Sequence, residues 1–532
     1  MTQDVEVHPK LLEPAILVLV VVLSVFGAII GLQLLTSLGV TPNTSMVGAL
    51  VAIALARVPL GLFRRYRSVH VQNLAQSAIS AATFGAANSL LLPIGIPFVL
   101  GRPDLIMPMF AGVACAMLLD GFLLYRMFDS KIFPATGAWP PGVAAAEAIR
   151  AGDEGGRKAA VLGAGIGVGA VGAWFGIPMS AFGIAFIGNV WALTMFGVGL
   201  LLRGYSKTLF SGPAFRSILP GGDLNAALVP HGFMIGAGLM ALVQVGLAIA
   251  RRDTGSETQA TPIRAGGTLG LGFAGYACIA VGIALAGGLV SELSVGWLVA
   301  FVLYAAFAAF VHELIVGLAA MHSGWFPAFA VALITLLIGI LIGFPPPALG
   351  LLVGFSAATG PAFSDMGCDL KAGFLLRAGH GAAFEMDGRR QQLYAAMAAF
   401  VVAIVVVGLT WQGYFARNLI PPVDRVYAAT IHNGLSGPAA TSMMLWAVPG
   451  ALMQLLGGQQ RQLGVLFATG LLIPAPLAGW AVLIGIVCRQ AWMAVRGAEG
   501  RSIMEVFAGG VIAGDALFSF FNSVGGSFSR RR

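Results

Sequence analysis

Apolar runs dominate this sequence of 532 residues, and most are close to the roughly 20 residues that a helix needs to cross a membrane. Only 10% of the residues are charged, whereas 58% are hydrophobic and the mean hydropathy is +0.89. A soluble domain needs more polar surface, and a disordered chain needs more charge. The sequence therefore predicts an all-α polytopic membrane protein. The runs lie near residues 13–35, 45–63, 71–95, 105–125, 159–175, 180–202, 227–250, 268–290, 295–320, 326–344, 347–366, 390–411, 435–456, 463–487 and 503–524.

The most polar linker, residues 251–264, ends close to the midpoint of the chain. Two similar halves joined by such a linker are typical of secondary transporters. We therefore expect two pseudo-repeated parts, an N-terminal transmembrane half at 1–250 and a C-terminal half at 267–532. A polar cytoplasmic linker at 251–266 would join them.

Basic residues predict the orientation, because short cytoplasmic loops are enriched in Lys and Arg. Both termini are expected in the cytoplasm, in a cell (inner or plasma) membrane. A crossing at 208–219 would keep the linker inside and give about 16 helices, while 132–150 would be re-entrant or interfacial. The loop with Arg489, Arg496 and Arg501 does not fit, since this topology places it outside. The basic residues assigned to the inside include Arg57, Arg64, Arg65, Arg67, Arg126, Lys131, Arg150, Arg157, Lys158, Lys371, Arg377, Arg389 and Arg390.

Several kinds of partner and cofactor are not expected. The basic residues do not form an aromatic-rich patch for nucleic acid, and the four cysteines are scattered without a CxxC pair. No GxxxxGK[ST] motif occurs, so ATP is not the expected energy source. We predict no cofactor, no metal site and no catalytic residues; the lipid bilayer is the expected surroundings, and a homo-oligomer is compatible with this class of protein.

Four stretches interrupt apolar runs with Gly, Pro and polar residues: 71–93, 133–152, 317–327 and 354–373. Irregular backbone at membrane depth is tolerated where it is buried in protein or lines a wet cavity, so broken or re-entrant helices indicate a substrate path. Gly and Pro also permit close helix packing, which is the structural alternative for any single stretch.

These stretches resemble the oligopeptide transporter (OPT) family, in particular its bacterial members related to the yellow-stripe-like metal-chelate transporters. The most specific block runs from Thr359-Gly360 through Ser364-Asp365 and Asp369-Leu370-Lys371 to Gly373. Further similarity lies in Pro140–Gly152, in Asn73 with Gln76, and in the late blocks Phe467–Pro474 and Gly510–Asp515. The chain departs from the family pattern at 140–143 and at 321–327, where the family would line its substrate path.

The resemblance implies a proton-coupled secondary transporter that imports short peptides or peptide-like metal chelates by alternating access. Protons would be the coupling ion, and the substrate would bind between the two halves near the middle of the membrane. The residues expected to line the path are Asn73, Gln76, Thr136, Gly137, Trp139, His322, Trp325, Thr359 and Ser364.

Three acids are candidates for proton coupling. Asp365 and Asp369 are spaced i, i+4 and share a helix face. The functional interpretation is favoured for Asp365, whereas an ion pair with Lys371 or an arginine is favoured for Asp369. For Glu147, coupling and an ion pair with Arg150 remain equal alternatives.

Other polar residues are predicted to be structural. Asp120 would meet Arg126 at the membrane interface, and Asp515 would make a packing contact. His312 and Glu313 would form a buried hydrogen-bonded pair.

An integral-membrane enzyme is the alternative class. Asp365 and Asp369 could bind Mg²⁺ for a lipid diphosphate, with Glu385 and Asp387 as the nearest second acidic group. The transporter is favoured, and no enzyme activity is expected.

Overall fold

The computed structural model describes residues 8–38, 65–215, 219–250, 265–324, 326–434, 437–497 and 500–529. Within these ranges the regular structure is helical, and the sole extended pairing is an isolated bridge between Phe128 and Phe133. Among the described residues, eight helical segments are long and apolar enough to cross a membrane, and four shorter apolar helices accompany them. The predicted all-α polytopic class is confirmed, while the total of about 16 crossings stays a prediction.

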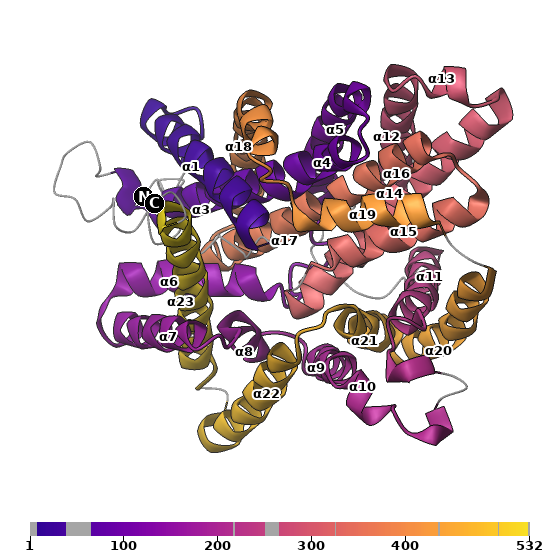
Figure 1. The fold of residues 1–532 in the computed structure, drawn as a ribbon. Helices are drawn as coiled ribbons and strands as arrows, with labels where there is room; N and C mark the ends of the chain where they lie inside the picture. The colour runs from indigo at the N-terminus through magenta and orange to yellow at the C-terminus, as the bar shows by residue number, and fades with distance from the viewer. Residues whose placement is uncertain are drawn as a thin grey trace.

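The helices form two packed groups with separate apolar cores (Figure 1). Group A, in the upper part of Figure 1, is centred on the buried helices α3 and α17. Its members are α1 (Pro14–Leu38), α3 (Val69–Phe84), α4 (Leu92–Val99), α5 (Ile106–Met127), α12 (Ala265–Ala286), α14 (Val295–Ser323), α15 (Ala328–Ile342), α16 (Pro346–Ala358), α17 (Pro361–Leu376), α18 (Ala382–Ala416) and α19 (Pro422–Asn433).

Group B lies below it in Figure 1 and is built largely from close helix pairs, α7 with α23, α9 with α21 and α11 with α20. Small residues allow this packing: a Cβ on Gly169 would lie 2.1 Å from the Val511 carbonyl oxygen. The members of group B are α6 (Pro140–Glu154), α7 (Gly156–Trp174), α8 (Met179–Ala185), α9 (Val190–Gly204), α11 (Val229–Ala250), α20 (Gly437–Arg461), α21 (Leu463–Leu472), α22 (Pro476–Arg496) and α23 (Gly500–Ser529).

Both groups contain helices from the first and second halves of the sequence. Parts of α14, α15 and α17 contribute residues to both apolar cores, so these helices form the seam between the groups. The division into halves at 1–250 and 267–532 stays a prediction about the sequence, and it does not coincide with the two spatial groups.

Three predicted crossings differ from the structure. The run at 180–202 forms α8 and α9, because the chain turns at 186–189, and the run at 463–487 forms α21 and α22 on either side of Ile473–Ala475. The proposed crossing at 208–219 is wrong, because its described part holds only the end of a four-residue helix and a 3₁₀ turn. The run at 45–63 and most of the linker, 251–264, lie outside the described residues.

Two of the four interrupted stretches form the most buried spans, Val69–Val99 and Pro346–Leu376. The first stays helical through a π-helical segment at Gly85–Leu91, and in the following helix α4 Pro93 and Pro97 lack the N–H groups of a regular ladder. The second is broken: Thr359 is extended and Gly360 has φ of +93°. Pro361 favours an end to the preceding helix and starts α17.

Candidate functional site

Helix α17 carries charged side chains on two opposite faces. Successive residues of an α-helix are rotated by about 100° around its axis. Asp365 and Asp369 therefore share one face, while Lys371 lies about 200° from Asp369. The acidic face packs against α3 in group A, and the Lys371 face turns toward α6. The two faces therefore place opposite charges in different surroundings.

On the acidic face, each carboxylate meets a neutral side chain of α3. Ser80 Oγ donates to Asp365 Oδ1 at 2.5 Å, and Gln76 Nε2 donates to Asp369 Oδ1 at 2.5 Å. Asn73 Nδ2 donates to Gln76 Oε1 at 3.0 Å and so extends the row. Asn73, Gln76 and Ser80 lie at i, i+3 and i+7, which places them on one side of α3.

Both acids are buried, and the Oδ2 atom of each has no hydrogen-bond partner among the described residues. An isolated charge is costly to bury, and protonation removes that cost. The predicted pairing of Asp369 with Lys371 or an arginine is wrong, because its side chain turns to Gln76 instead. The structure thus places two buried acids beside neutral hydrogen-bond donors on this face.

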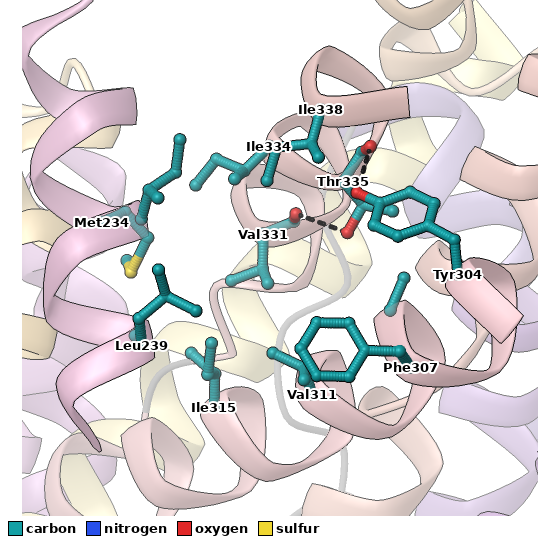
Figure 2. Close-up of a pocket in the computed structure, with 13 residues that line it drawn as sticks. Met234, Leu239, Tyr304, Phe307, Val311, Ile315, Val331, Ile334, Thr335 and Ile338 are labelled. Atoms are coloured by element: carbon teal, nitrogen blue, oxygen red, sulfur yellow. Dashed lines mark hydrogen bonds between the residues drawn. The ribbon is translucent and has the colours of Figure 1, made fainter. Parts of the chain in front are cut away.

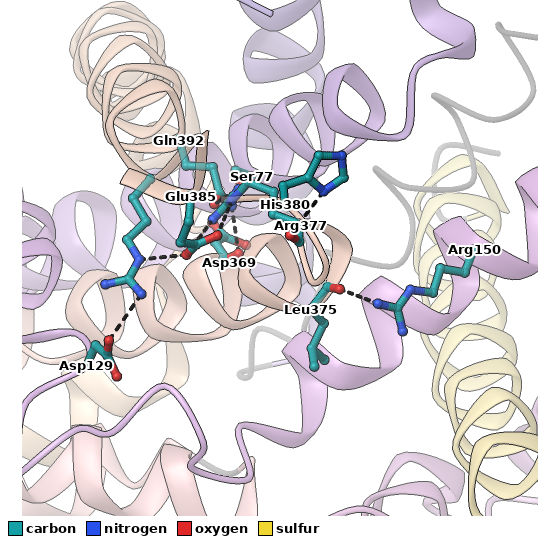
Figure 3. Close-up of polar contacts among 10 residues, drawn as sticks. Ser77, Asp129, Arg150, Asp369, Leu375, Arg377, His380, Glu385 and Gln392 are labelled. Carbon is teal, nitrogen blue, oxygen red and sulfur yellow. Dashed lines mark hydrogen bonds and ion pairs between the residues drawn. The ribbon is translucent and has the colours of Figure 1, made fainter. Parts of the chain in front are cut away.

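A network of charged and amide groups closes the end of the acidic face (Figure 3). Gln392 Nε2 donates to Ser77 Oγ at 3.1 Å and to the Asp369 carbonyl at 2.7 Å. Arg377 donates to Gln392 Oε1 at 2.9 Å and to Glu385 Oε2 at 2.6 Å. Arg377 is almost fully buried, so the network seals this end of α17 against α18.

The opposite face of α17 borders a cavity of about 330 Å³. Its volume falls within the range of about 300–1,000 Å³ that is usual for small-molecule sites. The cavity lies on the seam, between α17, α6, α23 and the turn that joins α8 to α9. Its lining residues are Thr136, Gly137, Ala138, Val143, Glu147, Arg150, Ile187, Gly188, Asn189, Lys371, Leu375, Arg501 and Glu505.

Charges of both signs line this cavity. Arg150 Nη1 pairs with Glu147 Oε1 at 2.9 Å, and Arg501 Nε pairs with Glu505 Oε1 at 2.8 Å. Lys371 is 6% exposed and donates to the Ala135 carbonyl at 2.8 Å, with no ion pair among the described residues. Three cations against two acids leave the cavity with one positive charge in excess.

Part of the predicted path lines this cavity. Thr136, Gly137 and Glu147 do so, and the ion pair of Glu147 with Arg150, one of the two alternatives for this acid, is present. Burial raises the pKa of Glu147 above its ordinary value, while the charge of Arg150 opposes that shift.

Other predicted path residues lie apart from the cavity lining. Trp139 is fully buried, and its ring covers Gly367, where a Cβ would lie 2.3 Å from the indole. His322 is half-buried and its carbonyl accepts from Asn189 N at 3.0 Å. Thr359 and Ser364 are buried beside the break in α16–α17, and Trp325 lies outside the described residues.

Sequence reasoning missed Asn189, Arg501 and Glu505 as cavity residues, and it considered Lys371 and Arg150 only as ion-pair partners. Arg501 and Glu505 are spaced i, i+4 on an apolar helix, and this spacing is a signal that could have been used. The structure also places Arg501 in one cavity with Arg150 and Lys371, while its predicted position outside the cytoplasm stays a prediction.

Three of the four residues predicted to be structural, Asp120, His312 and Glu313, have different partners from those expected. Asp120 does not meet Arg126; it is fully buried and accepts from Tyr276 Oη at 2.5 Å and from Gly360 N at 3.0 Å. His312 and Glu313 are not hydrogen-bonded to each other. His312 Nε2 contacts the Ala328 carbonyl at 2.7 Å, while Glu313 contacts Tyr276. Asp515 makes the expected packing contact, since its Oδ2 accepts from Ser180 N at 2.6 Å.

A second cavity lies between α11, α14 and α15 and is lined mainly by apolar side chains (Figure 2). Its volume is about 80 Å³, below the usual size of a ligand site. Tyr304 and Thr335 are its only polar lining residues, and Tyr304 Oη donates to the Thr335 carbonyl at 3.0 Å. This cavity is therefore a weaker candidate for a peptide-like substrate.

The acids required by the enzyme alternative are engaged elsewhere. Glu385 pairs with Arg377 and Arg389, and Asp387 pairs with Lys10. Within the described ranges, no group of three His, Cys, Asp or Glu side chains is arranged to hold a metal ion. The Mg²⁺ interpretation of Asp365 and Asp369 therefore has no support from the geometry.

The model of the family described as OPT oligopeptide transporter protein matches residues 14–250 and 251–525. The chain belongs to the OPT oligopeptide transporter family. A search of curated proteins found no match. Membership of the OPT family agrees with the apolar helices and makes the chain a multi-pass membrane protein of the oligopeptide transporter class.

Proposed function

We propose that this OPT family member is a proton-coupled importer of short peptides or peptide-like metal chelates. It would work by alternating access in a cell (inner or plasma) membrane with both termini in the cytoplasm. Similarity to the bacterial members related to yellow-stripe-like transporters, strongest at 359–373, supports the placement within the family. The observation that carries the proposal is the mixed-charge cavity that shares α17 with a buried acid pair.

The cavity suits a substrate that carries both an amine and a carboxylate. Lys371 offers an ammonium group whose only described hydrogen bond goes to a carbonyl, so a substrate carboxylate would gain a charge-assisted bond there. Glu147 and Glu505 lie in the same lining and would attract the amine. Peptides and amino-acid-derived chelators both have this pattern of charges.

The acid pair supplies a route for coupling. Asp365 and Asp369 lie one helical turn apart on the dry face of α17, and Lys371 follows on the wet face. A change in protonation would alter the bonds that join α17 to α3, and α17 also lines the cavity. Movement of group B against group A along this seam would then expose the cavity to either side in turn.

Uptake into proteoliposomes tests this function. The full chain is reconstituted with an imposed pH gradient, and labelled di- to hexapeptides and iron–chelator complexes are screened. Accumulation that follows the gradient is expected for at least one substrate. Accumulation that persists after the gradient is collapsed would contradict proton coupling, and the absence of uptake for every peptide and chelate would contradict the substrate class.

A further inference from the structure

A second cluster of buried acids lies beside the break between α16 and α17, away from Asp365 and Asp369. Tyr276 of α12 stands between Asp120 of α5 and Glu313 of α14, and all three are fully buried. Its hydroxyl lies 2.5 Å from Asp120 Oδ1 and also contacts Glu313 Oε2. One phenol oxygen therefore joins two carboxyl groups.

The proton count of this cluster follows from its geometry. A phenol hydroxyl carries one hydrogen and can donate to only one of the two carboxyl groups. The other contact is a hydrogen bond only if that carboxyl is itself protonated and donates to the phenol oxygen. The arrangement of Asp120, Tyr276 and Glu313 is satisfied when the two acids share one extra proton.

The hydrogen-bond partners of Asp120 and Glu313 indicate which of these two acids holds the extra proton. Asp120 Oδ2 accepts from Gly360 N at 3.0 Å at the N-terminal end of α17, where a negative charge is favoured. Glu313 Oε1 has no hydrogen-bond partner among the described residues, which fits a neutral acid better than a buried carboxylate. Tyr276 then donates to Asp120 and accepts from protonated Glu313.

Among the described residues, no cationic side chain pairs with this cluster to balance a second negative charge. Besides these three residues, the facing titratable group is His312, next to Glu313 on α14, and its Nδ1 lies 3.4 Å from Thr359 Oγ1. From α16, Phe355 packs edge-on against the Tyr276 ring. Among the described residues, neither Asp120 nor Glu313 forms an ion pair with a Lys or Arg side chain; their side-chain contacts are with Tyr276 and, for Asp120, with Gly360 N.

We propose that Asp120, Tyr276 and Glu313 form a second proton-binding site, with the proton on Glu313, and that this site controls the break at Thr359–Gly360. Loss of the proton breaks the Glu313 O–H bond and transfers the proton to water. Two carboxylates then compete for one hydroxyl, and one loses its hydrogen bond. Because Asp120 also holds Gly360 N, this competition acts directly on the start of α17.

The role of this site in transport rests on the proposed proton coupling, but its occupancy can be measured without transport. Infrared spectra of the purified full chain in lipid at neutral pH are compared for wild type and Glu313→Gln. The difference should contain one carboxylic-acid C=O band that shifts in D₂O. Asp120→Asn should instead remove carboxylate bands. A carboxylate band lost in Glu313→Gln would overturn the assignment.

Tyr276→Phe gives an independent reading if the Glu313→Gln variant does not fold. The acid band should persist and move to higher wavenumber, because Glu313 loses its acceptor. An unmoved band would overturn the bridging role.

In proteoliposomes, Glu313→Gln should make peptide counterflow independent of pH, while Glu292→Gln, a more exposed match, should retain the wild-type profile. An unchanged profile for Glu313→Gln would contradict control of the break, whatever the outcome of the gradient experiment.

Discussion

The two faces of α17 differ in the partners that they offer to a charge. Among the described residues, the side-chain partners of Asp365 and Asp369 are the neutral groups of Ser80 and Gln76, in a buried contact with α3. Lys371, about half a turn away, borders a cavity with two ion pairs. A buried neutral contact favours protonation of an acid, whereas a cavity lined by charges of both signs favours binding of a charged ligand.

This difference between the two faces suggests how one helix can couple the binding of protons to the binding of substrate. Protons and substrate need no shared contact if both act on the position of α17, which is held at its start by Gly360 and at its end by Arg377. The following predictions separate the faces, beginning with the change expected to have the largest effect.

Asp365→Asn should abolish gradient-driven accumulation, because the amide cannot take up a proton at this position. Peptide counterflow across proteoliposomes should remain measurable, since the cavity face is unchanged. Asp104→Asn, an exposed acid paired with Arg102, is the matched control and should accumulate substrate as wild type does. Accumulation by Asp365→Asn at the wild-type level would remove Asp365 from the coupling step.

Lys371→Gln should raise the KM for peptides with a free carboxylate by about 10- to 100-fold, the equivalent of losing one hydrogen bond to a charged group. Peptides amidated at the C-terminus should be affected much less. Lys371→Arg should recover part of the loss, and Lys207→Gln, a highly exposed match, should have no effect. An equal loss for free and amidated peptides would show that Lys371 does not bind the carboxylate.

Gly367→Ala should disturb both faces together, because its Cβ would lie 2.3 Å from the Trp139 ring. We expect a loss of roughly 1–3 kcal/mol in stability, the usual cost of overpacking. Thermal unfolding in detergent measures this effect, with Gly163→Ala as the control, since no atom lies within 4 Å of that Cβ. Equal unfolding temperatures for the two variants would contradict the close contact.

Asn73→Ala should have the smallest effect, because Asn73 reaches the acidic face only through Gln76. Loss of this neutral hydrogen bond should cost about 0.5–1.5 kcal/mol and change coupled uptake by no more than about tenfold. Initial uptake rates at several external pH values measure it. A loss as complete as that of Asp365→Asn would place Asn73 in the proton path itself.

The sequence was sufficient to predict the class, the family resemblance and several polar positions. Asp365 and Asp369 were assigned to one face from their spacing alone, and spacing also offered the pairing of Glu147 with Arg150 as one of two alternatives. Their partners across the helix contacts could not be predicted, because Ser80 and Gln76 are separated from α17 by 285 and 293 residues. Local periodicity contains no information about such contacts.

The errors have two physical origins. The runs at 180–202 and 463–487 contain no charged residue, so hydropathy predicted single crossings, although turns at 186–189 and 473–475 divide both. Asp120 was assigned to Arg126 because the two are one to two turns apart, yet its carboxylate meets Tyr276 and Gly360 from distant segments. Tertiary partners decided the case of Asp120, whereas local turns divided the two apolar runs.

Substrate-induced proton movement is the most direct test of separate roles for the two faces of α17. A pH-sensitive dye outside proteoliposomes reports protons taken up when a transported peptide is added without an imposed gradient. We predict alkalinisation for wild type, none for Asp365→Asn despite continued counterflow, and alkalinisation for Lys371→Gln only at higher peptide concentration. Proton uptake by Asp365→Asn equal to that of wild type would contradict the account.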